Sequence, residues 1–204
     1  MKKLVLASVM ALASISLLIA PTLRAQDSGQ IEIKDPAEYN AYQQAASQSD
    51  PSAKASGLES FLTSFPQTVV KKSVLEDLTV TYQKMGDANK AIGAATRLLQ
   101  VDPNNMKGIL ISVIDKRSEC LKTSDPQTCD DAAAIAKKGL AVAKPADYSD
   151  ADWKQMTDTG YPFFHSAIAL DDLVSKKDSK TAEEEYKKEL MLFPLPQTTS
   201  GELW

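Results

Sequence analysis

The sequence contains few of the residues on which most metal sites and many enzymes depend. Its 204 residues include a single histidine, His165, and two cysteines, Cys120 and Cys129. A site with several histidine ligands is therefore impossible, and an enzyme with a nucleophile and a histidine base would have to use His165. The sequence has neither a glycine-rich phosphate loop nor a D-x-D-x-D-G calcium loop. We expect no metal, no cofactor and no catalytic residue.

Glycine, proline and positive charge are also scarce. Eight glycines and ten prolines are too few for a collagen-like or low-complexity chain, and they disfavour a turn-rich β-sandwich. The 23 basic residues do not outnumber the 27 acidic ones, and the formal net charge is −4. Nucleic acid is therefore not an expected partner. Hydrophobic residues make up 43% of the chain, which is enough to bury a core.

The longest apolar run lies at the N-terminus. Residues 4–20 carry no charge and follow Lys2 and Lys3, and a small residue, Ala25, stands at the expected cleavage position. This pattern is typical of a secretory signal over 1–25. The alternative is an uncleaved membrane anchor, although a run of 17 residues is short for crossing about 30 Å of hydrocarbon. We expect an exported protein, periplasmic or extracellular, with no stable membrane insertion after cleavage.

Export changes the interpretation of Cys120 and Cys129. An even number of cysteines in an oxidising compartment indicates a disulfide. The eight residues between them do not give the Cys-x-x-Cys spacing of a catalytic redox pair. We predict one structural disulfide, Cys120–Cys129; the alternative is two unpaired thiols.

The clearest periodic segment is 73–100. Apolar residues with helical spacing occupy one face of each of its halves: Leu75, Leu78, Tyr82 and Met85 in the first, and Ala91, Ile92, Ala95, Leu98 and Leu99 in the second. Gly86 and Asp87 separate the halves. The segment is therefore predicted to be a helical hairpin whose two apolar stripes pack together.

The hairpin pattern recurs along the chain. Each second helix is followed by a proline, at Pro66, Pro103, Pro145 and Pro194. The first helices of the hairpins are expected at 37–48, 73–85, 106–121 and about 150–176. After an extended lead-in at 26–34, this gives four hairpins, or eight helices, over 35–196. Recurrence at this scale is typical of a solenoid, in which stacked hairpins share one continuous core.

Five residues of the segment 72–105 occupy the landmark positions of a known repeat: Leu78, Tyr82, Gly86, Ala91 and Pro103. In this order and spacing they resemble the tetratricopeptide repeat (TPR) family, in the style of exported bacterial cell-envelope proteins. The resemblance implies an all-α fold, a TPR-like α-solenoid of about four hairpins wound into a right-handed superhelix.

In TPR proteins the first helices of successive hairpins line a concave groove that binds proteins or peptides. Carried onto this sequence, the groove positions are Glu76, Val80, Gln83, Lys107, Leu110, Ile114 and Arg117. Their mixed character does not resemble a dense basic clamp for a C-terminal carboxylate. In the alternative interpretation, some of these residues only pack between repeats.

The third and fourth units depart from the family pattern. In the third, the turn is expected to lengthen to 122–128, closed by the disulfide. In the fourth, Gly160 and Pro162 are expected to interrupt the first helix by a kink or a break between 150–159 and 163–176. The tail, 197–204, is interpreted as the start of a truncated repeat; in the alternative interpretation, the open face of the fourth unit is covered by this tail or by another chain.

We therefore expect an exported TPR scaffold or adaptor that binds another protein or peptide without catalysis. One alternative is a small helical ligand-binding domain or enzyme centred on His165, with Asp172 seven residues further along the same helical face. Another alternative is a structural fragment of a longer TPR array.

Overall fold

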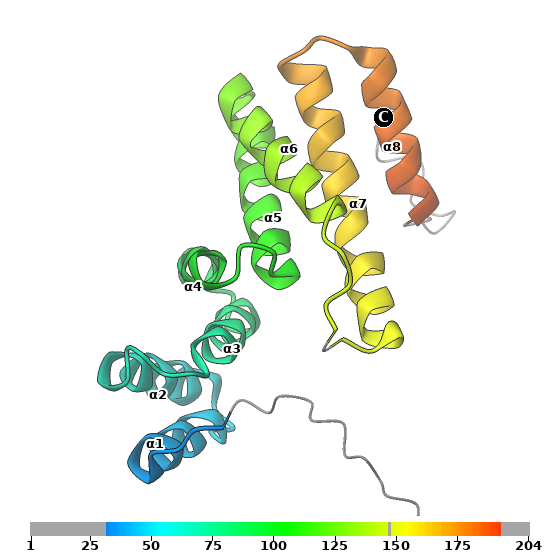
Figure 1. Cartoon of the computed structure of the whole chain (residues 1–204). Coiled ribbons are helices and arrows are strands. Elements are labelled where there is room, and N and C mark those ends of the chain that lie inside the picture. Colours follow the sequence, from blue (N-terminus) through cyan, green and yellow to red (C-terminus); the bar gives the residue numbers. More distant parts are fainter. Residues whose placement is uncertain (1–31, 147, 193–204) are drawn as a thin grey trace, which may run out of the picture. The chain divides into compact units, whose positions relative to one another are not determined.

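Every regular element that the computed structural model describes is an α-helix (Figure 1). The described residues are 32–146 and 148–192. In chain order the helices are α1 (Pro36–Ala46), α2 (Pro51–Ser64), α3 (Lys71–Lys84), α4 (Ala88–Val101), α5 (Met106–Thr123), α6 (Pro126–Leu140), α7 (Asp150–Val174) and α8 (Ser179–Leu192). These eight helices, with no strand in the described residues, confirm the all-α prediction.

Several predicted segments lie outside the described residues. They are the signal over 1–25, the first part of the lead-in at 26–34, and the tail at 197–204. The rest of the lead-in has no regular secondary structure, and its Ile33 packs half-buried against the first hydrophobic core. Within the described part of the chain, no helix has both the length and the apolar character needed to cross a membrane.

Short polar side chains fix where the helices begin. Four N-caps are aspartates whose carboxylates accept a backbone N–H bond: Asp35, Asp50, Asp87 and Asp125. Asn105 and Ser149 do the same for α5 and α7. Each cap satisfies N–H groups that have no partner in the first turn of a helix. Between α3 and α4, Gly86 has a φ of 72°, a left-handed conformation that glycine adopts without strain.

The α3–α4 hairpin packs as its sequence predicts. Leu78 and Leu98 are fully buried, and both belong to one hydrophobic core with Tyr82 and Ala91. That core is built from α1 to α4, whereas a second core is built from α5, α6 and α7. Leu99 packs against the second core. The helix α4 therefore contributes to both cores.

The order of packing brings three helices together. Each helix contacts the next one in the chain, and α3 also contacts α5, as α5 contacts α7. Helices α4 and α5 also lie close together at Gly108: a Cβ atom there would be 3.0 Å from the side chain of Leu99. The first helices of the second, third and fourth hairpins are thus in contact in succession, and they position the candidate site.

The helix α7 is continuous, so of the predicted kink or break between 150–159 and 163–176, the break does not occur. Pro162 lies inside the helix without ending it, although a proline in a helix interior costs about 3 kcal/mol. Because α5, α6 and α8 all contact α7, side chains such as Phe164 and Ala167 are fully buried. Burial of one large apolar side chain contributes about 1.5–3 kcal/mol, so a few such residues outweigh the effect of the proline.

The turn between α5 and α6 is short, and its predicted extension over 122–128 is also wrong. Helix α5 continues to Thr123 and α6 begins at Pro126, so that Ser124 and Asp125 alone connect them. Ser124 has a left-handed φ of 51°, and Asp125 caps α6. Most of the residues expected in the turn are therefore helical.

Cys120 and Cys129 form the predicted disulfide across this turn. Their Cα atoms are 5.0 Å apart, and both residues are buried beside Leu170 of α7. The bridge joins residues with a sequence separation of 9. For a loop of this size the chain-entropy model gives a stabilisation of about 2.6 kcal/mol.

Candidate functional site

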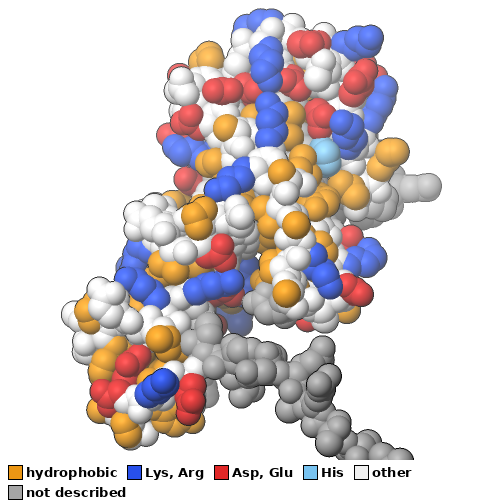
Figure 2. Space-filling model, viewed as in Figure 1, with side chains coloured by type: hydrophobic (Ala, Val, Ile, Leu, Met, Phe, Trp, Pro, Cys, Tyr) orange, Lys and Arg blue, Asp and Glu red, His pale blue; other side chains and the backbone are white. Residues whose placement is uncertain are grey.

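A groove with a volume of about 560 Å³ lies between α3, α5 and α7. Its lining residues are Glu76, Val80, Gln83, Lys107, Leu110, Ile111, Tyr148, Asp152, Gln155, Met156 and Thr159. Five of the seven positions predicted from the sequence are in this set. Figure 2 shows hydrophobic side chains gathered in the middle of the viewed face, where α5, α6 and α7 come together.

The apolar part of the groove comes from all three helices. Val80 of α3, Leu110 of α5 and Met156 of α7 are each half-buried, and Ile111, which also lines the groove, is buried. Half-buried apolar side chains that face a hollow can still bury area against a ligand, at about 25 cal/mol for each Å² removed from water. The groove therefore offers an apolar surface that the fold itself does not fully cover.

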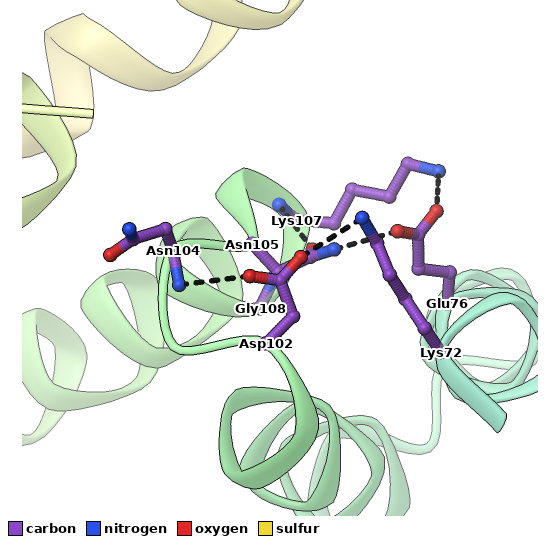
Figure 3. Close-up of polar contacts among 7 residues, drawn as sticks. All are labelled: Lys72, Glu76, Asp102, Asn104, Asn105, Lys107 and Gly108. Carbon is purple, nitrogen blue, oxygen red and sulfur yellow. Dashed lines mark hydrogen bonds and ion pairs between the residues drawn. The ribbon is translucent and has the colours of Figure 1, made fainter. Parts of the chain in front are cut away.

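A hydrogen-bonded cluster joins α3 to the start of α5 at one side of the groove (Figure 3). One oxygen of Glu76, Oε1, accepts a 2.6 Å bond from Nδ2 of Asn105, and the other, Oε2, accepts a 2.6 Å bond from Nζ of Lys107. Burial alone would lower the pKa of Lys107, but its hydrogen bond and attraction to Glu76 raise it above the ordinary value. Lys107 is therefore protonated, and its charge is paired with that of Glu76.

The same cluster fixes the connection between α4 and α5. Lys72 of α3 forms an ion pair with Asp102 at 3.0 Å, and the backbone N–H of Asn104 donates to Asp102 at 3.2 Å (Figure 3). Burial raises the pKa of Asp102, but the bonds from Lys72 and Asn104 lower it more, and the net shift is downward. Asn105 caps α5 by accepting from the N–H groups of Lys107 and Gly108. These bonds hold α3 and α5 in a fixed relation on two sides of the groove.

The third wall of the groove comes from α7 and from Tyr148, which lies just before this helix. Asp152, Gln155, Met156 and Thr159 lie at i, i+3, i+4 and i+7, which is one face of a helix. Tyr148 joins them, and its ring meets that of Trp153 edge-on at 5.9 Å between centroids. The groove positions predicted from the sequence do not include this wall, because they were taken only from the second and third hairpins. The helical spacing of these residues was the signal that could have found it.

Two predicted groove residues lie elsewhere. Arg117 donates from Nε to the hydroxyl of Ser166 at 2.8 Å, and Ser166 is fully buried on α7. Ile114 is half-buried and is not among the lining residues of the groove. Both follow Leu110 along α5 toward the part of α7 that carries Ser166. There α7 packs directly on α5, so the side chains of α5 contact protein instead of lining a hollow.

His165 does not pair with Asp172. Its Nδ1 lies 2.7 Å from Oε2 of Glu185 on α8, while Oδ1 of Asp172 accepts a 2.6 Å bond from Lys176. Burial raises the pKa of Glu185, but bonds from Lys188 and His165 lower it more, leaving it below its ordinary value. The histidine thus belongs to the interface between α7 and α8, and the dyad considered from the sequence is not formed.

A second hollow, of about 520 Å³, lies on α1 and α2. It is lined mainly by alanine, serine, glycine and glutamine, together with Phe61 and Phe65, and no charged residue is among the lining. In the described part of the chain, no group of three or more His, Cys, Asp or Glu side chains is placed to hold a metal ion. Of these two hollows, the groove between α3, α5 and α7 combines apolar, amide and ionic side chains.

Comparison with known proteins gives no assignment. No protein-family model matches the chain, and no curated protein matches it either.

Proposed function

We propose that the protein is an exported, TPR-like scaffold that binds a segment of another protein in the groove between α3, α5 and α7, without catalysis. The observation that carries the proposal is the groove itself. Positions expected to line a binding surface in α3 and α5 lie around one hollow, which α7 completes. Concave sites that combine apolar side chains with placed polar groups are typical of ligand and peptide binding.

The helix order supports the TPR-like part of the proposal. Eight consecutive helices pack in sequence, and α3, α5 and α7 are in contact in succession. Gly86 occupies the tight turn inside the best-matching repeat with a positive φ. In a solenoid of this kind the hairpins would continue as a right-handed superhelix, and the first helices would face the bound segment.

The disulfide supports export. Disulfides persist in oxidising compartments and are rare in the cytosol, and Cys120–Cys129 is a buried bridge in this fold. Together with the predicted signal over 1–25, it favours a periplasmic or extracellular location.

The binding proposal can be tested by site-specific photo-crosslinking in an envelope extract. A photoreactive residue at Gln83, which is exposed and lines the groove, should capture a protein partner. The same residue at Thr96, which is exposed on α4 and outside the lining set, is the matched control. A third position, Ser60, reports on the hollow of α1 and α2.

The proposal expects a defined crosslinked product from Gln83 that is weaker or missing from Thr96 and Ser60. Val80→Thr, which keeps the side-chain shape and replaces one methyl group with a hydroxyl, should reduce that product. Equal products from all three positions would contradict groove binding, as would a product from Ser60 alone.

A further inference from the structure

Two of the charged side chains in the groove form an ion pair with each other, and the third does not. Three of its lining residues carry charge: Glu76, Lys107 and Asp152. Lys107 and Glu76 neutralise each other at 2.6 Å, and Asn105 holds the second oxygen of Glu76. A partner carboxylate or phosphate that approached Lys107 would share this cation with Glu76 and would be repelled by the carboxylate of Glu76. The groove is therefore poorly suited to an acidic segment.

Asp152 is different. It is exposed at the start of α7, and its Oδ2 accepts a 2.7 Å bond from the hydroxyl of Ser149. Among the described residues no cation forms an ion pair with it, whereas its neighbour Asp150 is paired with Lys144. The wall formed by α7 therefore presents a negative charge that is not balanced within the groove.

The apolar surface of the groove accompanies this charge, because Val80, Leu110 and Met156 line the same hollow as Asp152. Apolar anchors and one cation are thus the chemistry that this surface complements.

We infer that the segment bound in this groove is apolar and carries a lysine or arginine that pairs with Asp152. The inference rests on the proposed function and adds the chemistry of the partner to it. Apolar side chains of the segment contact Val80, Leu110 and Met156, and the adjacent cation pairs with Asp152. A segment with glutamate in place of that cation is repelled.

The test begins with a random 12-residue peptide library displayed on phage and selected on the full chain with its disulfide intact. Enriched peptides are synthesised with lysine, glutamine or glutamate at the enriched basic position, and binding is measured by fluorescence anisotropy. Asp152→Asn keeps an acceptor for Ser149 while removing the charge. Asp158→Asn is the matched control, because Asp158 is also exposed on α7, pairs with Lys154, and does not line the groove.

We expect enriched peptides to combine apolar residues with a basic one. The lysine peptide should bind wild type about two- to fivefold more tightly than the glutamine peptide, as for an exposed ion pair. Asp152→Asn should remove that difference, Asp158→Asn should preserve it, and 0.5 M salt should reduce it.

Two failures are distinguishable. If enriched peptides lose affinity in Met156→Gln but show no basic preference and no effect of Asp152→Asn, the charge inference is overturned and groove binding stands. If no peptide is enriched, or if binding ignores Met156→Gln, groove binding itself is overturned and the inference falls with it. Circular dichroism melts of each variant confirm that the helices remain folded.

Discussion

The packing of α6 against α7 predicts a strong response to one added methyl group. A Cβ atom on Gly139 of α6 would lie 2.5 Å from Cε2 and 2.8 Å from Cζ of Phe164, and 2.9 Å from Cγ2 of Ile109. Phe164 is fully buried, and its ring also lies 3.4 Å from the Cβ position of Gly160. The ring has little space in which to move away.

The size of the effect follows from two opposing contributions. Overpacking a core costs about 1–3 kcal/mol, and three contacts under 3.0 Å place Gly139→Ala at the upper end of that range. Alanine gains up to about 1 kcal/mol over glycine in a helix. We expect a net loss of about 2 kcal/mol for Gly139→Ala. Gly93 on α4 is the control, because nothing lies within 4 Å of its Cβ position, so Gly93→Ala should stabilise by up to about 1 kcal/mol.

The assay is urea unfolding of the oxidised protein, followed by circular dichroism at 222 nm. The midpoint should fall for Gly139→Ala and rise for Gly93→Ala, with unchanged slope. A double-mutant cycle with Phe164→Leu should show a favourable coupling, because the smaller side chain makes room for the methyl group. A Gly139→Ala variant as stable as wild type would refute the reasoning, and with it the position of α7 as the third wall of the groove.

Three further predictions test other parts of the fold. Leu78→Ala removes a fully buried side chain from the first core and should cost about 2–5 kcal/mol in urea unfolding; a loss under about 0.5 kcal/mol would contradict the packing. Thiol labelling of the unfolded, unreduced protein should find neither Cys120 nor Cys129 reactive, and reduction should lower stability by about 2.6 kcal/mol; two labels per chain would exclude the bridge. Because the pKa of Asp102 is lowered in the folded state by Lys72, its contribution is present above the unfolded pKa of 3.8 and is lost as pH falls through the folded value. In Asp102→Asn, the free energy of unfolding should therefore fall less steeply as the pH drops below about 4, and an unchanged pH dependence would argue against the ion pair.

The sequence predicted best those elements whose signals are local. The α3–α4 hairpin has matching apolar stripes and a glycine turn, and Leu78, Tyr82 and Leu98 are buried as expected. The caps at Asp35 and Asp50 could also be predicted from local sequence, because each side chain accepts a bond from an N–H two or three residues away.

The two wrong predictions have different physical causes. The prediction of a break in α7 relied on Pro162. The helix stays continuous because three other helices bury Phe164 and its neighbours. That burial is a tertiary effect and cannot be read from the local sequence. The turn at 122–128 did carry a readable signal, because Asp125-Pro126 repeats the capping device of Asp35-Pro36.

The candidate site was predictable in part. The positions on α3 and α5 were proposed from the spacing of the resembled repeat, and Glu76, Val80 and Leu110 line the same hollow. The absence of Arg117 from the groove depends on its bond to Ser166, a residue 49 positions away in the sequence. Contacts of this range are set by how α7 lies on α5, and no local pattern encodes them.

The measurement that tests the central proposal most directly is hydrogen–deuterium exchange of the protein with and without the partner captured from Gln83. If the partner binds in the groove, exchange should slow in peptides from α3, from the first half of α5 and from the first half of α7, and should stay unchanged in α1, α2 and α8. Slowed exchange confined to α1 and α2, or to α8, would contradict the account.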